Sequence, residues 1–378
     1  MGRAICAFFL SGLFCLSSLW GMQESAAAAK TLVPGGHTVG IKLFSEGVVV
    51  IGLAEVETAF GASAPGATCG LQVGDVIEEV NGAEVESSEQ FAAMIQCGGK
   101  VDLSISRGGE DLILAAEPVL GEDGTYRLGA WIRDSMAGIG TVTFYDPTTG
   151  VFGALGHGVT DNDTGLLMPL GDGAVMDASV KAVKKGAVGE PGELKGSFDL
   201  TCDCGTLYAN TERGVFGVMS ESSAGGKALP IATAAEVKTG AAWIRSNVSG
   251  STVEEYDIEI LRILGKEGSQ NLLLRITDNR LIEQTGGIVQ GMSGSPIIQD
   301  GKLVGAVTHV LVNDPTRGYG IFTRNILHMH ITTFEFTTFI TSTNIIITRI
   351  AITIRNKMRF FYKRCIKAFF RNIFFNIK

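Results

Sequence analysis

The sequence predicts a mainly β protein of two domains that follow an apolar N-terminal segment. Its 378 residues are enough for two domains that each bury a hydrophobic core. Fifty of these residues are glycine, which favours many short strands and tight turns over long helices. Short apolar runs bounded by turn signals continue along most of the chain, as expected for β structure.

The charge is negative overall and unevenly distributed. A formal net charge of −8 argues against a nucleic-acid partner. From Arg324 to the end there are ten Lys and Arg residues and one acid, Glu335, so the rest of the chain is strongly acidic. Among the seven cysteines only Cys202 and Cys204 lie close together, which is weak evidence for a metal. We therefore predict no metal site.

Residues 1–29 have the pattern of an export signal. Arg3 precedes an apolar run from Ala4 to Trp20, and a group of small residues ends at Ala29. The apolar run is near the lower length limit for a membrane-spanning helix, so an uncleaved N-terminal anchor is the alternative. Either reading predicts that the bulk of the protein is exported.

The first domain is predicted at residues 31–118 and contains both strands and a helix. Apolar runs predict strands at 39–43 and 47–52. Ser87 and Gln90 fit a capping box, in which each side chain satisfies a free N–H group at the start of a helix.

The segment from Cys69 to Gly82 resembles the signature of PDZ domains, with cysteine at the usual alanine position. The resemblance implies an α+β fold that binds the ends of extended peptides by strand addition, with loop N–H groups taking the carboxylate. By this analogy Gly35, Gly36 and His37, before the first strand, form the candidate carboxylate loop. The alternative is a PDZ fold that only braces the next domain.

The second domain, residues 125–323, is predicted to be almost entirely β. Strands are expected at 128–133 and 140–145, and the one helix expected is short, near 281–284. His157 stands between Gly156 and Gly158 at a strand end, which leaves its ring accessible.

Ser293 lies in the glycine-rich bend from Gly291 to Pro296. Glycines beside a serine allow a tight turn that directs N–H groups to one side, as an oxyanion hole requires. Asp300-Gly301, between two apolar runs, predicts a two-residue hairpin that would hold the bend rigidly.

A serine hydroxyl needs a base to take its proton and a group that orients the base. The chain offers a histidine, several acids and a serine on an all-β scaffold, an order that resembles the chymotrypsin-like barrel peptidases. Four segments resemble the SpoIVB peptidase family more specifically: 154–158, 276–278, 285–296 and 305–310.

This resemblance implies site residues by position. It assigns the nucleophile to Ser293, the base to His157 and the orienting acid to Asp278, with the N–H groups of Gly291 and Ser293 as the oxyanion hole. Alternatives remain open at this point. Ser295 is a rival nucleophile and Asp161 and Asp163 are rival acids, whereas His309 is expected to be structural or to line the cleft.

The family further implies a sporulation serine endopeptidase that uses no cofactor and is secreted into the space between the two membranes of the forespore. Its expected partners are its own chain and a membrane-associated regulator of an intramembrane protease, whose cleavage permits pro-sigma-K processing. The alternative function is an exported PDZ peptide-binding protein with an inactive peptidase-like domain.

The composition changes abruptly at Arg324. Residues 324–378 lack Gly, Pro, Val and Asp and are rich in Ile, Phe, Thr, Asn, Lys and Arg. We predict an aberrant basic tail that is not part of the fold, with a basic-aromatic membrane arm as the alternative.

Overall fold

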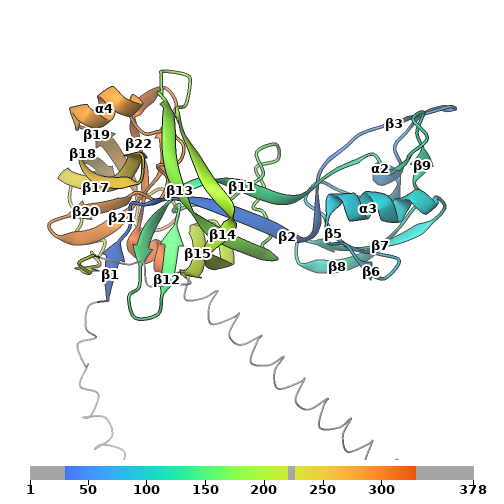
Figure 1. Cartoon of the computed structure of the whole chain (residues 1–378), viewed down its shortest axis with the longest axis horizontal. Coiled ribbons are helices and arrows are strands. Elements are labelled where there is room, and N and C mark those ends of the chain that lie inside the picture. Colours follow the sequence, from blue (N-terminus) through green and yellow to red (C-terminus); the bar gives the residue numbers. More distant parts are fainter. Residues whose placement is uncertain (1–29, 220–225, 329–378) are drawn as a thin grey trace, which may run out of the picture.

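The computed structural model describes residues 30–219 and 226–328. Two bodies are joined by a ribbon of two long strands, β2 (Thr38–Leu53) and β11 (Ala130–Tyr145), as Figure 1 shows. The larger body contains two barrels, and the smaller body combines strands with short helices. The predicted fold class, a mainly β chain with a PDZ domain and a chymotrypsin-like peptidase domain, is confirmed.

The predicted signal or anchor, residues 1–29, lies outside the described residues. Among the helices of the two described ranges, none is both long enough and apolar enough to cross a membrane.

The first barrel is a ring of six strands. The ring closes because β2 pairs with β11 on one side and with β13 (Asp172–Lys184) on the other. The remaining strands connect β11 to β13, each paired with its neighbour in the ring. β1 (Thr31–Pro34) pairs with β11, and β16 (Leu229–Pro230) pairs with β1. In ring order the strands are β2, β11, β12 (Val151–Ala154), β15 (Gly214–Met219), β14 (Glu193–Thr211) and β13 (Asp172–Lys184).

The second barrel is closed and also has six strands, with helix α4 (Asn279–Thr285) outside the ring. α4 confirms the short helix predicted near 281–284. The strands, in ring order, are β17 (Gly240–Ser249), β18 (Thr252–Ile263), β19 (Leu272–Ile276), β22 (Asp314–Phe322), β21 (Lys302–Leu311) and β20 (Pro296–Gln299).

The predicted hairpin after the serine bend is present between β20 and β21. Gln299 pairs with Lys302, and the two residues between them, Asp300 and Gly301, have φ of 51° and 72°. Positive φ at both central positions is the requirement of a type I′ turn, which asparagine, aspartate and glycine meet most readily.

The smaller body is the PDZ domain. Its helix α3 (Ser88–Met94) has the predicted N-cap, since Gln90 N–H donates to Ser87 Oγ at 3.1 Å. The Gln90 side chain reaches one residue further back than a capping box requires, and its Oε1 accepts from Glu86 N–H at 2.6 Å. A buried Asp75 pairs with Arg107 at 2.7 Å. The remaining elements are β3 (Val56–Thr58), β4 (Gly61–Ser63), α2 (Pro65–Cys69), β5 (Val76–Val80), β6 (Ala83–Glu84), α3 (Ser88–Met94), η1 (Ile95–Cys97), β7 (Val101–Arg107), β8 (Glu110–Ala116), β9 (Val119–Leu120) and β10 (Tyr126–Arg127).

The ribbon between the bodies differs from the sequence prediction. The strands expected at 39–43 and 47–52 are one strand, β2, and those expected at 128–133 and 140–145 are joined in β11. The first part of β2, with β1, belongs to the first barrel and not to the PDZ domain, whose core cluster begins at Val48. Local apolar patterns missed this continuity because the β2–β11 pairing shifts register twice along the ribbon.

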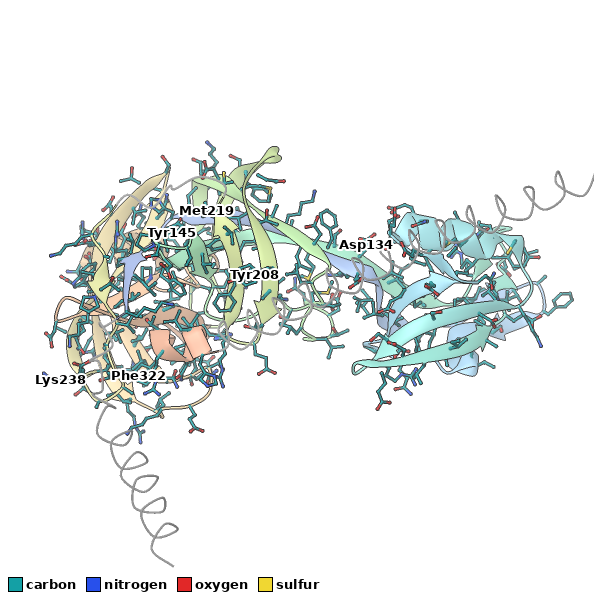
Figure 2. All side chains as sticks on the ribbon, turned by 90° about the horizontal axis from the view of Figure 1, so that it is seen from below. Asp134, Tyr145, Tyr208, Met219, Lys238 and Phe322 are labelled. Carbon is teal, nitrogen blue, oxygen red and sulfur yellow. The ribbon has the colours of Figure 1, made fainter. Side chains whose placement is uncertain are left out.

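The ribbon is fastened to the PDZ domain by a side chain. Asp134, labelled in Figure 2 between the two bodies, lies on β11, and its Oδ2 accepts from Ser88 N–H at 2.8 Å. This bond satisfies a free N–H group in the first turn of α3.

The predicted tail boundary at 324 is wrong. Asn325, Ile326 and Leu327 are buried, and the last two pack in a cluster with side chains from both barrels, including Leu32, Phe216 and Leu303. The composition did not show that these residues are buried, because it cannot distinguish apolar residues that complete a core from apolar residues of a tail outside the fold. Residues 329–378 of the predicted tail lie outside the described residues.

Candidate active site

The Ser293 loop joins α4 to β20 and lies against the first barrel. Thr141 N–H, on β11, donates to Ser293 O at 3.0 Å. Gly294, with φ of 99°, has no room for a side chain, since a Cβ there would lie 2.0 Å from Thr141 O. The glycine is therefore required both by its backbone conformation and by this close approach.

Two N–H groups of the loop remain without an acceptor in the described part of the chain. Three other N–H groups of the loop do have acceptors: the N–H groups of Met292, Gly294 and Ser295 donate to Val289 O, Val307 O and Met292 O, at 3.1, 2.8 and 2.9 Å. The N–H groups of Gly291 and Ser293 have no such bond among the described residues. These are the two groups predicted to form the oxyanion hole, and they are free to bind a developing negative charge.

His157 follows β12 of the first barrel, at a strained turn. Leu155, two residues earlier, has φ of 68°, a conformation that is rare for a leucine. The ring Nδ1 lies 2.8 Å from Gly158 O. A carbonyl can only accept, so Nδ1 carries the proton and Nε2 has the lone pair that a general base uses.

Strand β21 brings the two segments to one place. Ser293 Oγ donates to Thr308 O at 2.6 Å, and the ring of the next residue, His309, lies 5.0 Å from the ring of His157 between centroids. In this state the serine hydroxyl is therefore bonded to a carbonyl and not to the imidazole. Catalytic hydrogen bonds often form only when substrate is bound, and a rotation about the serine χ1 would free the hydroxyl.

Burial favours the neutral form of the imidazole at this site. Desolvation lowers the pKa of His157 below its ordinary value, against a smaller opposing effect of the bond to Gly158 O. The pKa of His309 is also lowered, first by desolvation and then by the neighbouring His157. A neutral His157 is the form that can accept a proton from serine.

The predicted acids have other partners. Asp278 caps α4: its Oδ1 accepts from Arg280 N–H at 2.9 Å, and its Oδ2 accepts from Arg280 Nη2 at 2.8 Å. The hydrogen bonds from Arg280 lower the pKa of Asp278. Asp161 and Asp163 both pair with Arg133 of β11, at 2.9 and 3.0 Å. Among the described contacts, none joins any of these carboxylates to His157.

The rival nucleophile, Ser295, is fully buried. Its hydroxyl donates to Ser246 Oγ at 3.0 Å, inside the second barrel. A hydroxyl in this position has no access to a substrate. Ser293, by contrast, is partly exposed.

The predicted carboxylate loop of the PDZ domain lies in the first barrel instead. The N–H groups of Gly35 and Gly36 donate to Thr143 O and Val142 O at 2.9 and 2.8 Å, and His37 O accepts from Val142 N–H at 3.0 Å. These N–H groups are therefore occupied and cannot hold a peptide carboxylate. The analogy failed because this segment pairs with β11 and not with the PDZ sheet.

Sequence reasoning missed residues that act at this site through the backbone. Thr141, Thr308 and Gly158 meet the Ser293 loop or His157 mainly through carbonyl or N–H groups, which leave no side-chain signal in a sequence. The glycine at 158 was noticed only as a flanking residue. A Cβ there would lie 2.6 Å from Thr211 O, so the close approach requires glycine.

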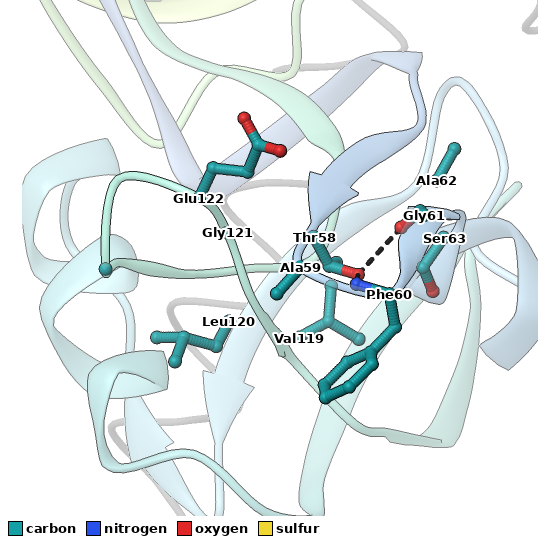
Figure 3. Close-up of a pocket in the computed structure, with 11 residues that line it drawn as sticks. Thr58, Ala59, Phe60, Gly61, Ala62, Ser63, Val119, Leu120, Gly121 and Glu122 are labelled. Atoms are coloured by element: carbon teal, nitrogen blue, oxygen red, sulfur yellow. Dashed lines mark hydrogen bonds between the residues drawn. The ribbon is translucent and has the colours of Figure 1, made fainter.

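A pocket that Figure 3 shows lies elsewhere, in the PDZ domain. It is lined by the β3–β4 hairpin, with a fully exposed Phe60 at its tip, and by residues 119–122 and 124. None of the predicted catalytic residues lines it. In the described ranges we find no group of three or more His, Cys, Asp or Glu residues that could hold a metal ion.

Solved structures resemble parts of the chain at low sequence identity. The PDZ domain of an SdrC-like protein from Listeria monocytogenes is 24% identical over 23% of this chain and 87% of its own, with a TM-score of 0.19. The active form of the Rv3671c protease from M. tuberculosis is 16% identical over 51% and 72%, with a TM-score of 0.29. The HtrA-type protease AlgW with a decapeptide is 13% identical over 53% and 54%, with a TM-score of 0.32.

Sequence families give a firmer result. Among curated proteins, none matches the sequence significantly. The profile of PDZ domains matches residues 60–104, within the smaller body. The profile of the SpoIVB peptidase S55 family matches residues 124–327, more than half of the chain, and includes His157, Ser293 and the buried residues 325–327. The chain therefore belongs to the SpoIVB peptidase S55 family and carries a PDZ domain.

Proposed function

We propose that the protein is a serine endopeptidase in which Ser293 is the nucleophile and His157 the general base. The observation that carries the proposal is the Ser293 loop, where the N–H groups of Gly291 and Ser293 have no acceptor among residues 30–219 and 226–328, beside a partly exposed serine. His157, whose ring contacts the ring of His309 on β21 and whose pKa is lowered by desolvation, supplies the base. The reaction is acyl transfer: Ser293 Oγ attacks the peptide carbonyl, and Nε2 of His157 takes its proton and passes it to the leaving amine.

The orienting group in this proposal is the carbonyl of Gly158. It holds Nδ1 of His157 at 2.8 Å, the position that an aspartate occupies in chymotrypsin-like triads. The resemblance assigns this role to Asp278, and the contacts of Asp278 with Arg280 and α4 favour a structural role for it instead.

The substrates and location follow from the family and are proposed with it. We infer an exported enzyme of sporulation that acts in the forespore intermembrane space, with possible retention by its N-terminal segment. It cleaves itself and a membrane-associated regulator of an intramembrane protease, and so permits pro-sigma-K processing. The PDZ domain holds a peptide end of a protein partner, through a loop other than residues 35–37.

A serine-directed phosphonate tests the chemistry. We expect it to label the wild-type protein at Ser293, and the Ser293→Ala variant to be neither labelled nor able to cleave itself. Thermal unfolding of the variant should match that of the wild type, because the hydroxyl contributes one hydrogen bond to Thr308 O. Self-cleavage by a folded Ser293→Ala variant would refute the proposal. Peptide binding without labelling would instead support a PDZ binding protein with an inactive peptidase-like domain.

A further inference from the structure

Thr141 of β11 contacts both segments that carry the proposed catalytic residues. Its hydroxyl donates to Gly291 O at 2.7 Å and its N–H donates to Ser293 O at 3.0 Å. Its carbonyl accepts from Leu155 N–H at 3.1 Å, two residues before His157. Thr141 is fully buried, and all its polar groups are used in this way.

The two hydrogen bonds from Thr141 to the Ser293 loop are accepted by the carbonyls of Gly291 and Ser293. These two carbonyls lie on either side of the peptide unit that carries the Ser293 N–H group. Holding both carbonyls limits the rotations that would turn this N–H away from the oxyanion position. The loop also lies directly against Thr141, since a Cβ on Gly294 would meet its carbonyl oxygen.

The third bond reaches the His157 segment. Leu155 has positive φ, which costs energy for a branched side chain and persists only where surrounding contacts hold it. The bond from its N–H to Thr141 O is one such contact. One residue of the first barrel therefore connects the serine loop of the second barrel to the histidine turn.

We propose that Thr141 is a positioning residue, whose hydroxyl holds the Gly291 carbonyl and so fixes the oxyanion loop relative to His157. This inference rests on the proposed function of Ser293 and His157. It assigns Thr141 no contact with substrate. Its effect appears in the rate of the chemical step, because misplacement of the donors weakens stabilisation of the transition state more than binding of the substrate.

The strand offers a matched control. Thr143 lies two residues further along β11 and is equally buried, and its hydroxyl has no hydrogen-bond partner in the part of the chain that the structure describes. Thr141→Val and Thr143→Val each remove one buried hydroxyl and keep the backbone N–H. Thr141→Ser restores a hydroxyl at the first position.

The test measures kcat, KM and the rate of phosphonate labelling of Ser293, with thermal unfolding as a check of the fold. We expect Thr141→Val to lower kcat and the labelling rate about 100-fold with KM changed less than about threefold, since small misplacements cost this much. Thr141→Ser should recover most of the rate, and Thr143→Val should behave like the wild type. Equal rates for Thr141→Val and the wild type, or an equal loss for both valine variants, would overturn the inference.

A second readout separates this inference from the proposed function. If the phosphonate does not label the wild type, the assignment of Ser293 as the nucleophile is wrong. The clamp, meaning the hold of Thr141 on the Ser293 loop, is then tested by hydrogen–deuterium exchange of residues 291–295. Faster exchange in Thr141→Val than in Thr143→Val supports the clamp, because the amide groups there would open more often. Equal exchange in the two variants overturns it.

Discussion

Replacing Ile326 with alanine tests whether the chain beyond Phe322 belongs to the fold. The side chain is fully buried in a cluster with residues of both barrels. Removing three carbons loses about 2.4 kcal/mol of transfer free energy at about 0.8 kcal/mol for each carbon. The cavity left behind adds to this, so we expect the free energy of unfolding to fall by about 3–4 kcal/mol. In a domain of this size the melting temperature should fall by roughly 6–16 °C.

The assay is urea and thermal unfolding followed by circular dichroism, with Leu264→Ala as the matched control. Leucine is an isomer of isoleucine, and Leu264 of the second barrel is exposed, so its replacement should change stability by less than about 0.5 kcal/mol. A chain that ends at His328 keeps Ile326 and the bond from Asn325 Nδ2 to Lys266 O, whereas a chain that ends at Phe322 loses both. Equal stability of Ile326→Ala and Leu264→Ala would refute our reading of the core.

Two further predictions concern the titrating groups. Asp278→Asn removes the charge paired with Arg280 but keeps a side chain that can cap α4, so we expect kcat within about tenfold of the wild type. A fall of about 10⁴-fold in peptide hydrolysis would show that Asp278 orients the base after all. Acidification should weaken both activity and stability, because desolvation lowers the pKa of His157 in the folded state. Below the ordinary histidine pKa of about 6.5, the unfolded chain then binds more protons than the folded chain. The free energy of unfolding therefore rises with pH in this window, and this part of the stability is lost as the pH falls. Unfolding curves and the pH dependence of Ser293 labelling check this, and an acid limb of labelling centred above 6.5 would contradict it.

Local chemistry made several features predictable from the sequence. The N-cap at Ser87, the hairpin at Asp300-Gly301 and the short helix near 281–284 each depend on neighbours in the chain, and all three are present. The PDZ signature is of the same kind. Its last two residues, Asn81 and Gly82, have positive φ, as the turn between β5 and β6 requires.

Long-range pairing was not predictable in this way. Residues 38–44 pair with both 135–141 and 172–177, and nothing in an apolar run shows which distant strand it will join. Assigning this segment to the PDZ domain led to the unsuccessful choice of Gly35, Gly36 and His37 as a carboxylate loop. The role of Thr141 was hidden for a related reason, since its partners in the Ser293 loop are main-chain carbonyls 150 or more positions away along the chain.

The chain leaves the first barrel along β2, builds the PDZ domain and comes back along β11. The peptide-binding module is therefore an insertion into the protease fold and not an appended neighbour. A fragment started at residue 124, where the family similarity begins, would lack β1 and β2 and leave the ring unclosed. Removing the PDZ domain without harming the enzyme would require a short turn that reconnects Phe44 to Ser135, residues that already pair across the ribbon.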